Sequence, residues 1–196
     1  MSIEKEYSEL KSKVIERKHD FDDFINFLEN KTTWLTAPAS VRYHLSEKKG
    51  LLKHSVGVTN TLLKLRELLT PQLSEESCII VGLFHDVGKI GMPHSPRYKE
   101  DGEKFVYNKN QIEMQIANKS LYLVSKYIPL SDEEAQAILY HDGQYIPENR
   151  FIAHKECPLT LLLTFADTWT AAVYEEGREI KDNKNYFKRE WNDNHE

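Results

Sequence analysis

Three histidines and two aspartates of this sequence stand where a metal ion could be bound. His85 and Asp86 are adjacent, at the inner end of the apolar run "SCIIVGLF". Two ionisable groups at the end of such a run are costly to bury unless something pairs with them, and a metal ion is the obvious candidate. The other members of the set lie far apart in the chain: His54, His141 and Asp167.

Imidazole and carboxylate groups together suit zinc, manganese, iron, nickel or cobalt, and the mixture does not select among these metals. Such a site can lower the pKa of a bound water to about 7 and so supply hydroxide at neutral pH. Each residue alone also has an ordinary structural explanation; a lone histidine such as His54 is more often a hydrogen-bonded core residue. Asp167 is harder to explain in that way, because "LLLTFADTWTAA" surrounds it with apolar residues and buried carboxylates usually have partners.

The first two of these positions are expected on consecutive helices. Apolar residues at helical spacing predict a helix over 50–70 that Pro71 ends, with His54 in its first turns. Ser74 predicts the start of the next helix, because its hydroxyl can accept a hydrogen bond from a free amide of the first turn. That helix is expected to end near 88, just past the His-Asp pair.

The remaining two positions are expected on later helices. Ser131 and Glu134 form a capping-box pattern, which predicts a helix that ends near His141. Pro158 is suited to the first turn of a final core helix, with Asp167 in its middle.

Other segments complete the predicted architecture. The pattern predicts a first helix over 3–17 and a second one capped by Asp20. Residues 92–110 contain two prolines and many polar groups, which predicts a loop with a short hairpin around Asp101 and Gly102 that could cover a site. Because period-two alternation is almost absent, we predict an all-α fold, a single-domain helical bundle.

Composition narrows the class of protein. A chain of 196 residues with 40% hydrophobic and 29% charged residues suits one ordinary soluble domain, and no apolar stretch approaches the ~20 residues that span a bilayer. The charged start "MSIEKEYSELKSK" has no signal-peptide core, so we expect a cytoplasmic protein. A net charge of −5 argues against a broad basic face for long nucleic acid and favours a small phosphorylated substrate. Cys78 and Cys157 form no CxxC pair and are expected to be small thiols.

The segments "GLLKHSVGV", "LFHDVGKIG" and "TFADTWTAA", in this order and approximate spacing, resemble the HD-domain superfamily of metal-dependent phosphohydrolases. The resemblance covers 37–176, with N-terminal helices expected in 1–36 and a polar tail in 177–196. It implies an HD-type helical bundle in which four residues bind metal, namely His54, His85, Asp86 and Asp167.

The preceding stretch "APASVRYHLSEKKGLLKHS" resembles a narrower subset that includes phage-type HD proteins and the HD domain of bacterial 3′-to-5′ exoribonucleases. This makes Arg42 and His44 candidates for binding substrate, since a guanidinium can hold phosphate by two parallel hydrogen bonds. A surface arginine and a structural histidine are the ordinary alternatives.

The resemblance also implies catalytic roles. In this family, the lysine at the position of Lys89 points toward the phosphate and stabilises the charge that develops on it. His141 resembles a family histidine that binds a second metal or contacts the phosphate. Catalytic roles therefore fall on Asp86, Lys89 and His141.

One departure from the family concerns the number of metals. Two-metal relatives usually supply another histidine after the loop, and the corresponding "MQIANKSLYLV" has none. One divalent transition metal is therefore favoured over a binuclear centre, although His94 or a substrate oxygen could supply the missing ligand. His19, His154 and His195 lie outside the family motifs and are expected to be structural or solvated.

The predicted function is hydrolysis of a phosphoester by metal-activated water, on a nucleotide or a short oligonucleotide. Mononucleotides, deoxynucleoside triphosphates, cyclic nucleotides and short RNA or DNA all stay open as substrates, no membrane role is expected, and the oligomeric state is not predicted. The alternative is a nucleotide-binding sensor or partner-binding protein that keeps the fold but is catalytically slow or inactive. A structural interaction protein with a vestigial site is a third hypothesis.

Overall fold

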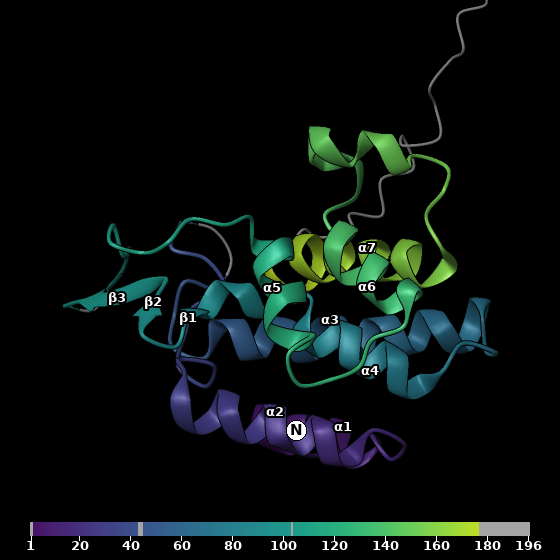
Figure 1. Cartoon of the computed structure of the whole chain (residues 1–196), viewed down its shortest axis with the longest axis horizontal. Helices are drawn as coiled ribbons and strands as arrows, with labels where there is room; N and C mark the ends of the chain where they lie inside the picture. The colour runs from purple at the N-terminus through teal and green to yellow at the C-terminus, as the bar shows by residue number, and fades with distance from the viewer. Residues whose placement is uncertain (1, 43–44, 103, 177–196) are drawn as a thin grey trace, which may run out of the picture.

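The computed structural model describes residues 2–42, 45–102 and 104–176, and Figure 1 shows their helices in three layers. The N-terminal helices form one outer layer, α3 and α4 lie in the middle, and α5, α6 and α7 form the other outer layer. The α-helices are α1 (Ile3–Ser12), α2 (Lys18–Lys31), α3 (Gly50–Leu69), α4 (Glu75–Phe84), α5 (Ile116–Val124), α6 (Asp132–Tyr140) and α7 (Pro158–Trp169). Short 3₁₀ turns are η1 (Val87–Ile90), η2 (Gly143–Tyr145) and η3 (Pro147–Ile152), and a π-helix, η4 (Thr170–Glu175), continues α7.

The prediction of a helical fold is confirmed, and strands in the described ranges occur as two small antiparallel ribbons. β1 (Gly91–Met92) pairs with β2 (Ser95–Pro96), and β3 (Tyr98–Asp101) pairs with β4 (Lys104–Tyr107). The second ribbon is the hairpin expected around Asp101 and Gly102. Gly102 has a φ of 62°, a left-handed conformation that glycine adopts without a steric cost.

Local capping signals predicted several helix starts correctly. The Ser74 hydroxyl accepts from the Ser77 amide at the start of α4. Ser131 and Glu134 form both hydrogen bonds of a capping box at the start of α6. Pro158 is in the first turn of α7, where its missing amide hydrogen costs nothing.

The predicted end of the first helix was wrong, since α1 ends at Ser12 rather than near 17. The reason is a tertiary contact: the backbone amides of Ile15, Glu16 and Arg17 donate to the Glu76 carboxylate at 2.8, 2.8 and 3.2 Å instead of continuing the helix. Arg17 rather than Asp20 is therefore the residue that precedes α2.

The helix before the His-Asp pair also ends earlier than predicted. α4 stops at Phe84, His85 follows as its C-cap, and η1 carries the chain past Asp86. Gly88 allows this turn to press against α5, because a Cβ atom there would lie 2.4 Å from the Ile116 carbonyl oxygen. The Gly88 amide donates to Ser120 Oγ at 2.8 Å, which joins η1 to α5.

A single hydrophobic core extends from the N-terminal helices to α7. Trp34 is fully buried in it and its indole nitrogen donates to the Tyr7 hydroxyl at 3.0 Å. Both cysteines are free thiols, as expected. In the described ranges, no helix combines the length and the apolar character that crossing a membrane requires.

Candidate metal centre

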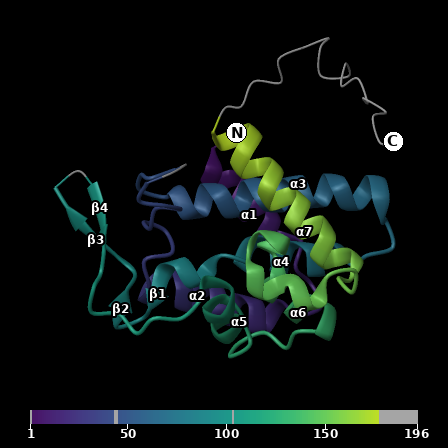
Figure 2. The same cartoon turned by 90° about the horizontal axis from the view of Figure 1, so that it is seen from above.

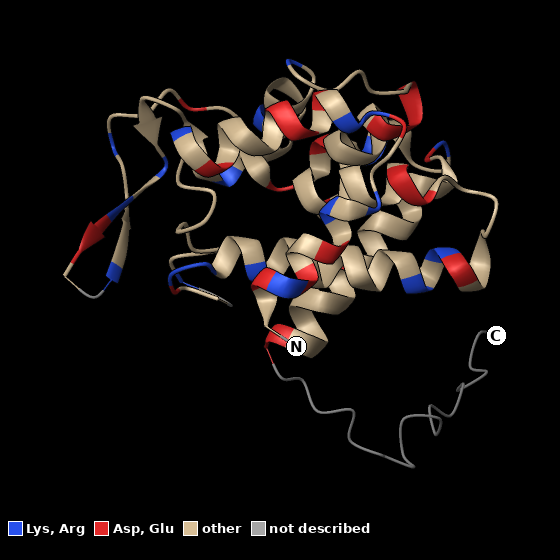
Figure 3. Cartoon of the chain, turned by 90° about the horizontal axis from the view of Figure 1, so that it is seen from below, with Lys and Arg blue, Asp and Glu red and all other residues tan. Residues whose placement is uncertain are grey.

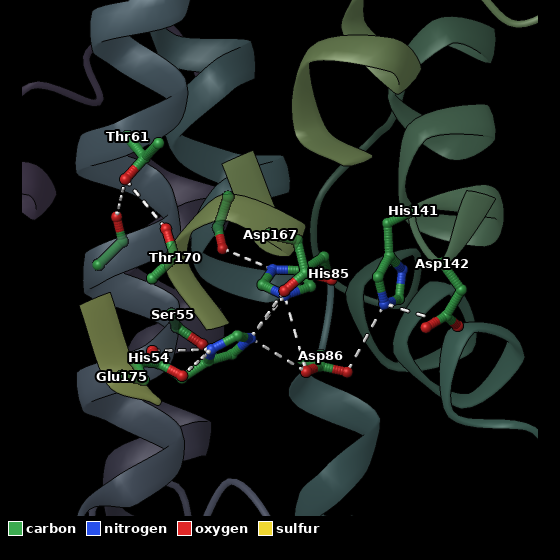
Figure 4. A network of polar contacts seen from close by, with 12 residues as sticks. His54, Ser55, Thr61, His85, Asp86, His141, Asp142, Asp167, Thr170 and Glu175 are labelled. Atoms are coloured by element: carbon green, nitrogen blue, oxygen red, sulfur yellow. Dashed lines mark hydrogen bonds and ion pairs between the residues drawn. The ribbon is translucent and has the colours of Figure 1, made fainter. Parts of the chain in front are cut away.

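Three separate segments of the chain bring the four predicted ligands to one point between the middle and outer layers (Figure 4). His54 is in the second turn of α3, His85 and Asp86 follow the end of α4, and Asp167 is on α7. Figure 2 shows α7 crossing over α3, which is how Asp167 reaches His54 across more than one hundred residues of chain. His54, His85, Asp86 and Asp167 are called the His–Asp cluster below.

The ligand atoms of His54, His85 and Asp167 all lie within 4.8 Å of one another, close enough to share one ion, and Asp86 faces both of these histidines. His54 Nε2 lies 3.2 Å from Asp167 Oδ1, 3.4 Å from Asp86 Oδ2 and 3.3 Å from His85 Nε2. His85 Nε2 lies 3.7 Å from Asp86 Oδ2 and 3.9 Å from Asp167 Oδ1. Bonds to zinc of about 2.1 Å allow two ligand atoms to be at most about 4.2 Å apart. The donor set therefore fits a transition metal, and the structure brings all four predicted residues together.

The histidines are oriented for this role by the ends of their own helices. His85 Nδ1 donates to the Gly82 carbonyl at 2.8 Å, and His141 Nδ1 donates to the Ile138 carbonyl at 2.8 Å. Carbonyls in the last turn of a helix have no amide partner within the helix, so they accept these protons. Because a carbonyl only accepts, Nδ1 carries a hydrogen in both rings, and in the neutral His85 ring the lone pair of Nε2 faces the cluster.

Glu175 does the same for His54 and was missed by the sequence analysis. The two Glu175 carboxylate oxygens lie 3.0 and 3.2 Å from His54 Nδ1, and the Glu175 side chain is 8% exposed. A carboxylate behind a ligating histidine fixes the tautomer and raises the basicity of the ring. In the sequence, Glu175 looks like a solvated charge at a helix end. The one available signal was indirect: a buried histidine needs a hydrogen-bond partner for its second ring nitrogen.

The π-helix at the end of α7 places Glu175 over His54. Gly57, one turn after His54, leaves room for it, because a Cβ atom at Gly57 would lie 3.0 Å from Thr170 Cγ2. The hydroxyls of Thr61 and Thr170 are 3.0 Å apart and hold the same junction. Such single π-turns occur frequently at functional sites.

The buried histidines differ in how easily they take up a proton. Burial, together with the charges of His141 and His54, lowers the pKa of His85 to about 4, so this ring is neutral at pH 7. Burial also lowers the pKa of His54, but hydrogen bonds to Asp167, Asp86 and Glu175 outweigh it and hold that pKa well above its usual value. Burial opposes the charge of His141 as well, but the hydrogen bond with Asp86 and the charges of Asp142 and Asp167 together outweigh it and raise the pKa to about 9.

The carboxylates of the cluster stay ionised. Burial favours the neutral form of Asp86, but the Lys89 ammonium and the surrounding histidines hold its pKa well below the usual value. The pKa of Asp167 is lowered in the same way, chiefly by the hydrogen bond with His54. The cluster therefore presents two carboxylates and a neutral imidazole, a combination that favours binding of a cation.

Lys89 lies beside the cluster, where the family resemblance implied a lysine near the phosphate. Its ammonium forms an ion pair with Asp86 Oδ2, and the side chain is 20% exposed. Burial opposes the charge on Lys89, but Asp86 raises its pKa, so the ammonium stays protonated.

A second, overlapping group of ligand atoms lies next to the first. The other Asp86 oxygen, Oδ1, faces His141 Nε2 at 3.7 Å, and the ligand atoms of His85, Asp86 and His141 all lie within 4.8 Å of one another. Asp142 Oδ2 is 3.8 Å from His141 Nε2. Gln115, in the segment that lacks a histidine, borders the same space.

A cavity of about 640 Å³ opens from the cluster. The residues that line it come from α5 and from the turns between α6 and α7, as well as from the cluster itself. They include His54, Asp86, Lys89, Gln115, Ile116, His141, Asp142, Tyr145, Ile146, Asn149 and Asp167. The site thus has room for a ligand with direct access to the cluster.

The expectation that Asp167 is surrounded by apolar residues was wrong in part. Its side chain is 20% exposed, and its neighbours Phe165 and Trp169 are 56% and 45% exposed. One face of α7 looks outward and the opposite face packs on the core. Asp167 lies between them, at the edge of the cavity.

The structure describes one of the two predicted substrate residues, Arg42, and this residue is not part of the arrangement. Arg42 is exposed and is not among the residues that line the cavity. His44 lies outside the described residues. His94 is exposed in the turn between β1 and β2, and His19 and His154 are exposed too, whereas His195 is another residue outside the described ranges.

Comparison with known proteins gave one family. The family model described as HD domain matches residues 51–188, which is more than half of the chain and includes every member of the His–Asp cluster. Arg42 and His44 precede the matched region. No curated protein and no solved structure gave a significant match.

Proposed function

Because this chain belongs to the HD-domain superfamily of metal-dependent phosphohydrolases, we propose that it hydrolyses a phosphoester bond of a nucleotide or a short oligonucleotide. The observation that carries the proposal is the convergence of four side chains that could bind a metal, at the base of a cavity and beside the half-buried Lys89. Membership of the family supports the reaction class, and the nucleotide substrate is the part that we propose.

The His–Asp cluster would hold one divalent transition metal: manganese, iron, nickel, cobalt or zinc. When bound there, such a metal activates a water molecule and polarises a phosphoryl oxygen. His85 and His54 offer Nε2 to it, since their Nδ1 atoms are occupied by Gly82 and Glu175. Asp86 and Asp167 add two negative charges that balance its charge.

Lys89 and His141 would act on the phosphate. The Lys89 ammonium lies at the base of the cavity, where it can neutralise charge that develops on the phosphoryl oxygens. His141 also lines the cavity, and its protonated ring can donate Nε2–H to a phosphate oxygen or to the leaving oxygen. Arg42 and His44 stay candidates for holding the distal part of a substrate.

The size and charge of the site favour a small substrate. A cavity of about 640 Å³ is within the range of ordinary ligand pockets, which runs from roughly 300 to 1,000 Å³. Lysine, arginine, aspartate and glutamate are interspersed along the helices in Figure 3. Such a mixture supports a nucleotide or a short RNA or DNA end better than a long duplex.

A nucleotide-binding sensor or partner-binding protein is the second candidate. Gln115 favours it, because this amide borders the cavity in the segment where two-metal relatives supply a histidine. A site that lacks one metal ligand would bind metal less completely, and it would bind a nucleotide but hydrolyse it slowly.

The test is an assay of the full chain against nucleotides and short RNA and DNA, with manganese, magnesium, zinc, nickel or a chelator added. We expect hydrolysis that is lost with chelator and in Asp86→Ala but kept in Asp101→Ala, a control on the exposed hairpin. Tight nucleotide binding without product under every metal would favour the sensor. No bound metal, together with unchanged stability of Asp86→Ala, would leave only a vestigial site.

A further inference from the structure

A second, smaller cavity of about 190 Å³ adjoins the first. It lies between the loop before α3, the β3–β4 ribbon and the start of α5. Its lining residues are Ala39, Ser40, Lys89, Arg97, Tyr98, Tyr107 and Ile116. Lys89 and Ile116 line both cavities, so the second one lies directly beside the cavity at the metal centre.

Arg97 is held in this second cavity by its backbone and by two aromatic rings. Its amide donates to the Ile90 carbonyl at 3.2 Å, and its carbonyl accepts from the Asn108 amide at 2.8 Å. The guanidinium carbon lies 5.2 Å from the ring centre of Tyr107 and 5.8 Å from that of Tyr98. Stacking of this kind fixes the plane of the guanidinium, which also forms a hydrogen bond with the Tyr98 side chain.

The charge of Arg97 is not balanced within the described part of the chain. No carboxylate there forms an ion pair with it, and its Nε atom is buried without a hydrogen-bond partner. A buried donor without a partner is costly, so a ligand oxygen or water is expected beside it.

Lys119, on α5, adds a second unbalanced cation in the same region. The side chain is fully buried and its Nζ has no hydrogen-bond partner among the described residues. Its pKa is lowered mainly by burial and further by the charge of Arg97, which Glu113 opposes. An anion near Arg97 would relieve this repulsion.

We infer that the second cavity is a subsite for a second phosphate group of the substrate, with Arg97 as the residue that binds it. Lys89 then faces the reacting phosphate, and Arg97 holds a phosphate one linkage away by charge-assisted hydrogen bonds. This inference rests on the proposed function. It favours substrates with two or more phosphates over mononucleotides and cyclic mononucleotides, which carry one.

The first test is a binding test that needs no turnover. Inorganic pyrophosphate and orthophosphate are titrated calorimetrically into the full chain, in the original sequence and in Arg97→Gln and Lys99→Gln. Lys99 is an exposed lysine of the same ribbon, so its loss changes the net charge equally. We expect pyrophosphate to bind more tightly than orthophosphate, and Arg97→Gln to weaken pyrophosphate about 10- to 100-fold with a much smaller effect on orthophosphate.

The second test identifies the source of the second phosphate. Adenosine diphosphate stands for a nucleoside polyphosphate, a 5′-phosphorylated adenosine dinucleotide for an oligonucleotide end, and adenosine monophosphate for a single phosphate. We expect Arg97→Gln to reduce kcat/KM for one of the first two at least tenfold more than for the monophosphate, mostly through KM, with Arg97→Lys intermediate.

Equal effects of Arg97→Gln on pyrophosphate and orthophosphate, or no preference of the original chain for pyrophosphate, would overturn the subsite. Absence of hydrolysis of every compound, with the pyrophosphate preference intact, would instead overturn the proposed function and keep the subsite.

Discussion

The Arg17 cluster, formed by Arg17, Glu76 and Glu134, and the His–Asp cluster both bury charged groups between helices, but they are completed differently. Arg17 donates to Glu134 through two nitrogens at 2.8 and 2.7 Å and to Glu76 through Nε at 2.9 Å. The carboxylates accept further backbone amides, from Ile15 and Ser131 among others. Donors and acceptors match, so this cluster is complete within the chain.

The His–Asp cluster has the opposite balance of donors and acceptors. The Nε2 atoms of His54 and His85 face each other at 3.3 Å, and carboxylate oxygens of Asp86 and Asp167 face the same space. The groups that face this space are mostly acceptors, namely carboxylate oxygens and ring nitrogens. One cation shared between them can interact with more of these atoms than a bound proton can. Burial alone therefore does not mark a functional group; an excess of acceptors around one point does.

The largest effect is expected from a change that disrupts the His–Asp cluster and preserves the fold. Removing the metal with a chelator, or changing Asp167→Asn, should reduce kcat/KM at least about 10⁴-fold, about 5.4 kcal/mol of transition-state stabilisation. The amide keeps the size of the side chain but loses the charge that balances a cation. Steady-state kinetics, with thermal unfolding as a folding check, measure this; activity within tenfold of the original chain would contradict the ligand assignment.

The second largest effect is expected from a change that disrupts the Arg17 cluster. Arg17→Ala leaves two buried carboxylates without their cation and should lower the free energy of unfolding by about 3–5 kcal/mol. Urea unfolding measures it. Metal affinity of the folded variant should stay unchanged, because Arg17 touches no member of the His–Asp cluster.

The matched control for Arg17 is Lys13→Ala. Lys13 pairs with Glu75 across the same junction, but the two side chains are 49% and 45% exposed. Exposed pairs contribute about 1 kcal/mol or less. Equal losses from the two variants would show that burial of the Arg17 cluster adds nothing.

The comparison of clusters also explains what could be predicted from sequence. The His–Asp cluster depends on residue types in a recognisable order, so four ligands and Lys89 were predicted by resemblance. Helix starts at Ser74 and Ser131 were predicted because their capping partners lie within three residues.

Features that depend on contacts between distant segments were not predictable in this way. The end of α1 is set by Glu76, about sixty residues later, whose carboxylate captures three backbone amides. Glu175 reaches His54 through a π-helix, and a pattern read at 3.6 residues per turn does not reveal that change of face. Arg97 acquires its aromatic neighbours only after the hairpin forms.

A smaller effect is expected on metal affinity when Glu175 is changed, and it tests the role of this residue behind His54. Metal affinity, measured by competition with a chromophoric chelator, should fall about 10-fold in Glu175→Gln and about 100-fold in Glu175→Ala. The amide oxygen of glutamine still accepts from His54 Nδ1 but carries no charge, which explains the graded loss. Glu67→Gln, an exposed change of equal charge on α3, should have no effect. Affinity losses that follow thermal stability rather than this order would assign Glu175 a purely structural role.

The smallest effect concerns the acid stability of the Arg17 cluster. Arg17 and the backbone amides overcome burial and hold the pKa of both Glu76 and Glu134 below the usual 4.5. Groups with lowered pKa values stabilise the fold above the unfolded value and lose that contribution as the pH falls through the folded value. The stability difference between the original chain and Arg17→Met should therefore be full at pH 7 and shrink progressively below about pH 4.5.

Urea unfolding at a series of pH values tests this difference. Asp86 and Asp167 also have lowered pKa values, so the stability of both proteins falls in acid, but this contribution is common to them and cancels in the difference. Lys13→Ala should run nearly parallel to the original chain, because its ion pair is exposed. A difference that stays constant from pH 7 to pH 3 would mean that Arg17 stabilises the fold through packing of its aliphatic part. In that case the two clusters would no longer differ in the way proposed, since neither would owe its stability to charges matched within the chain.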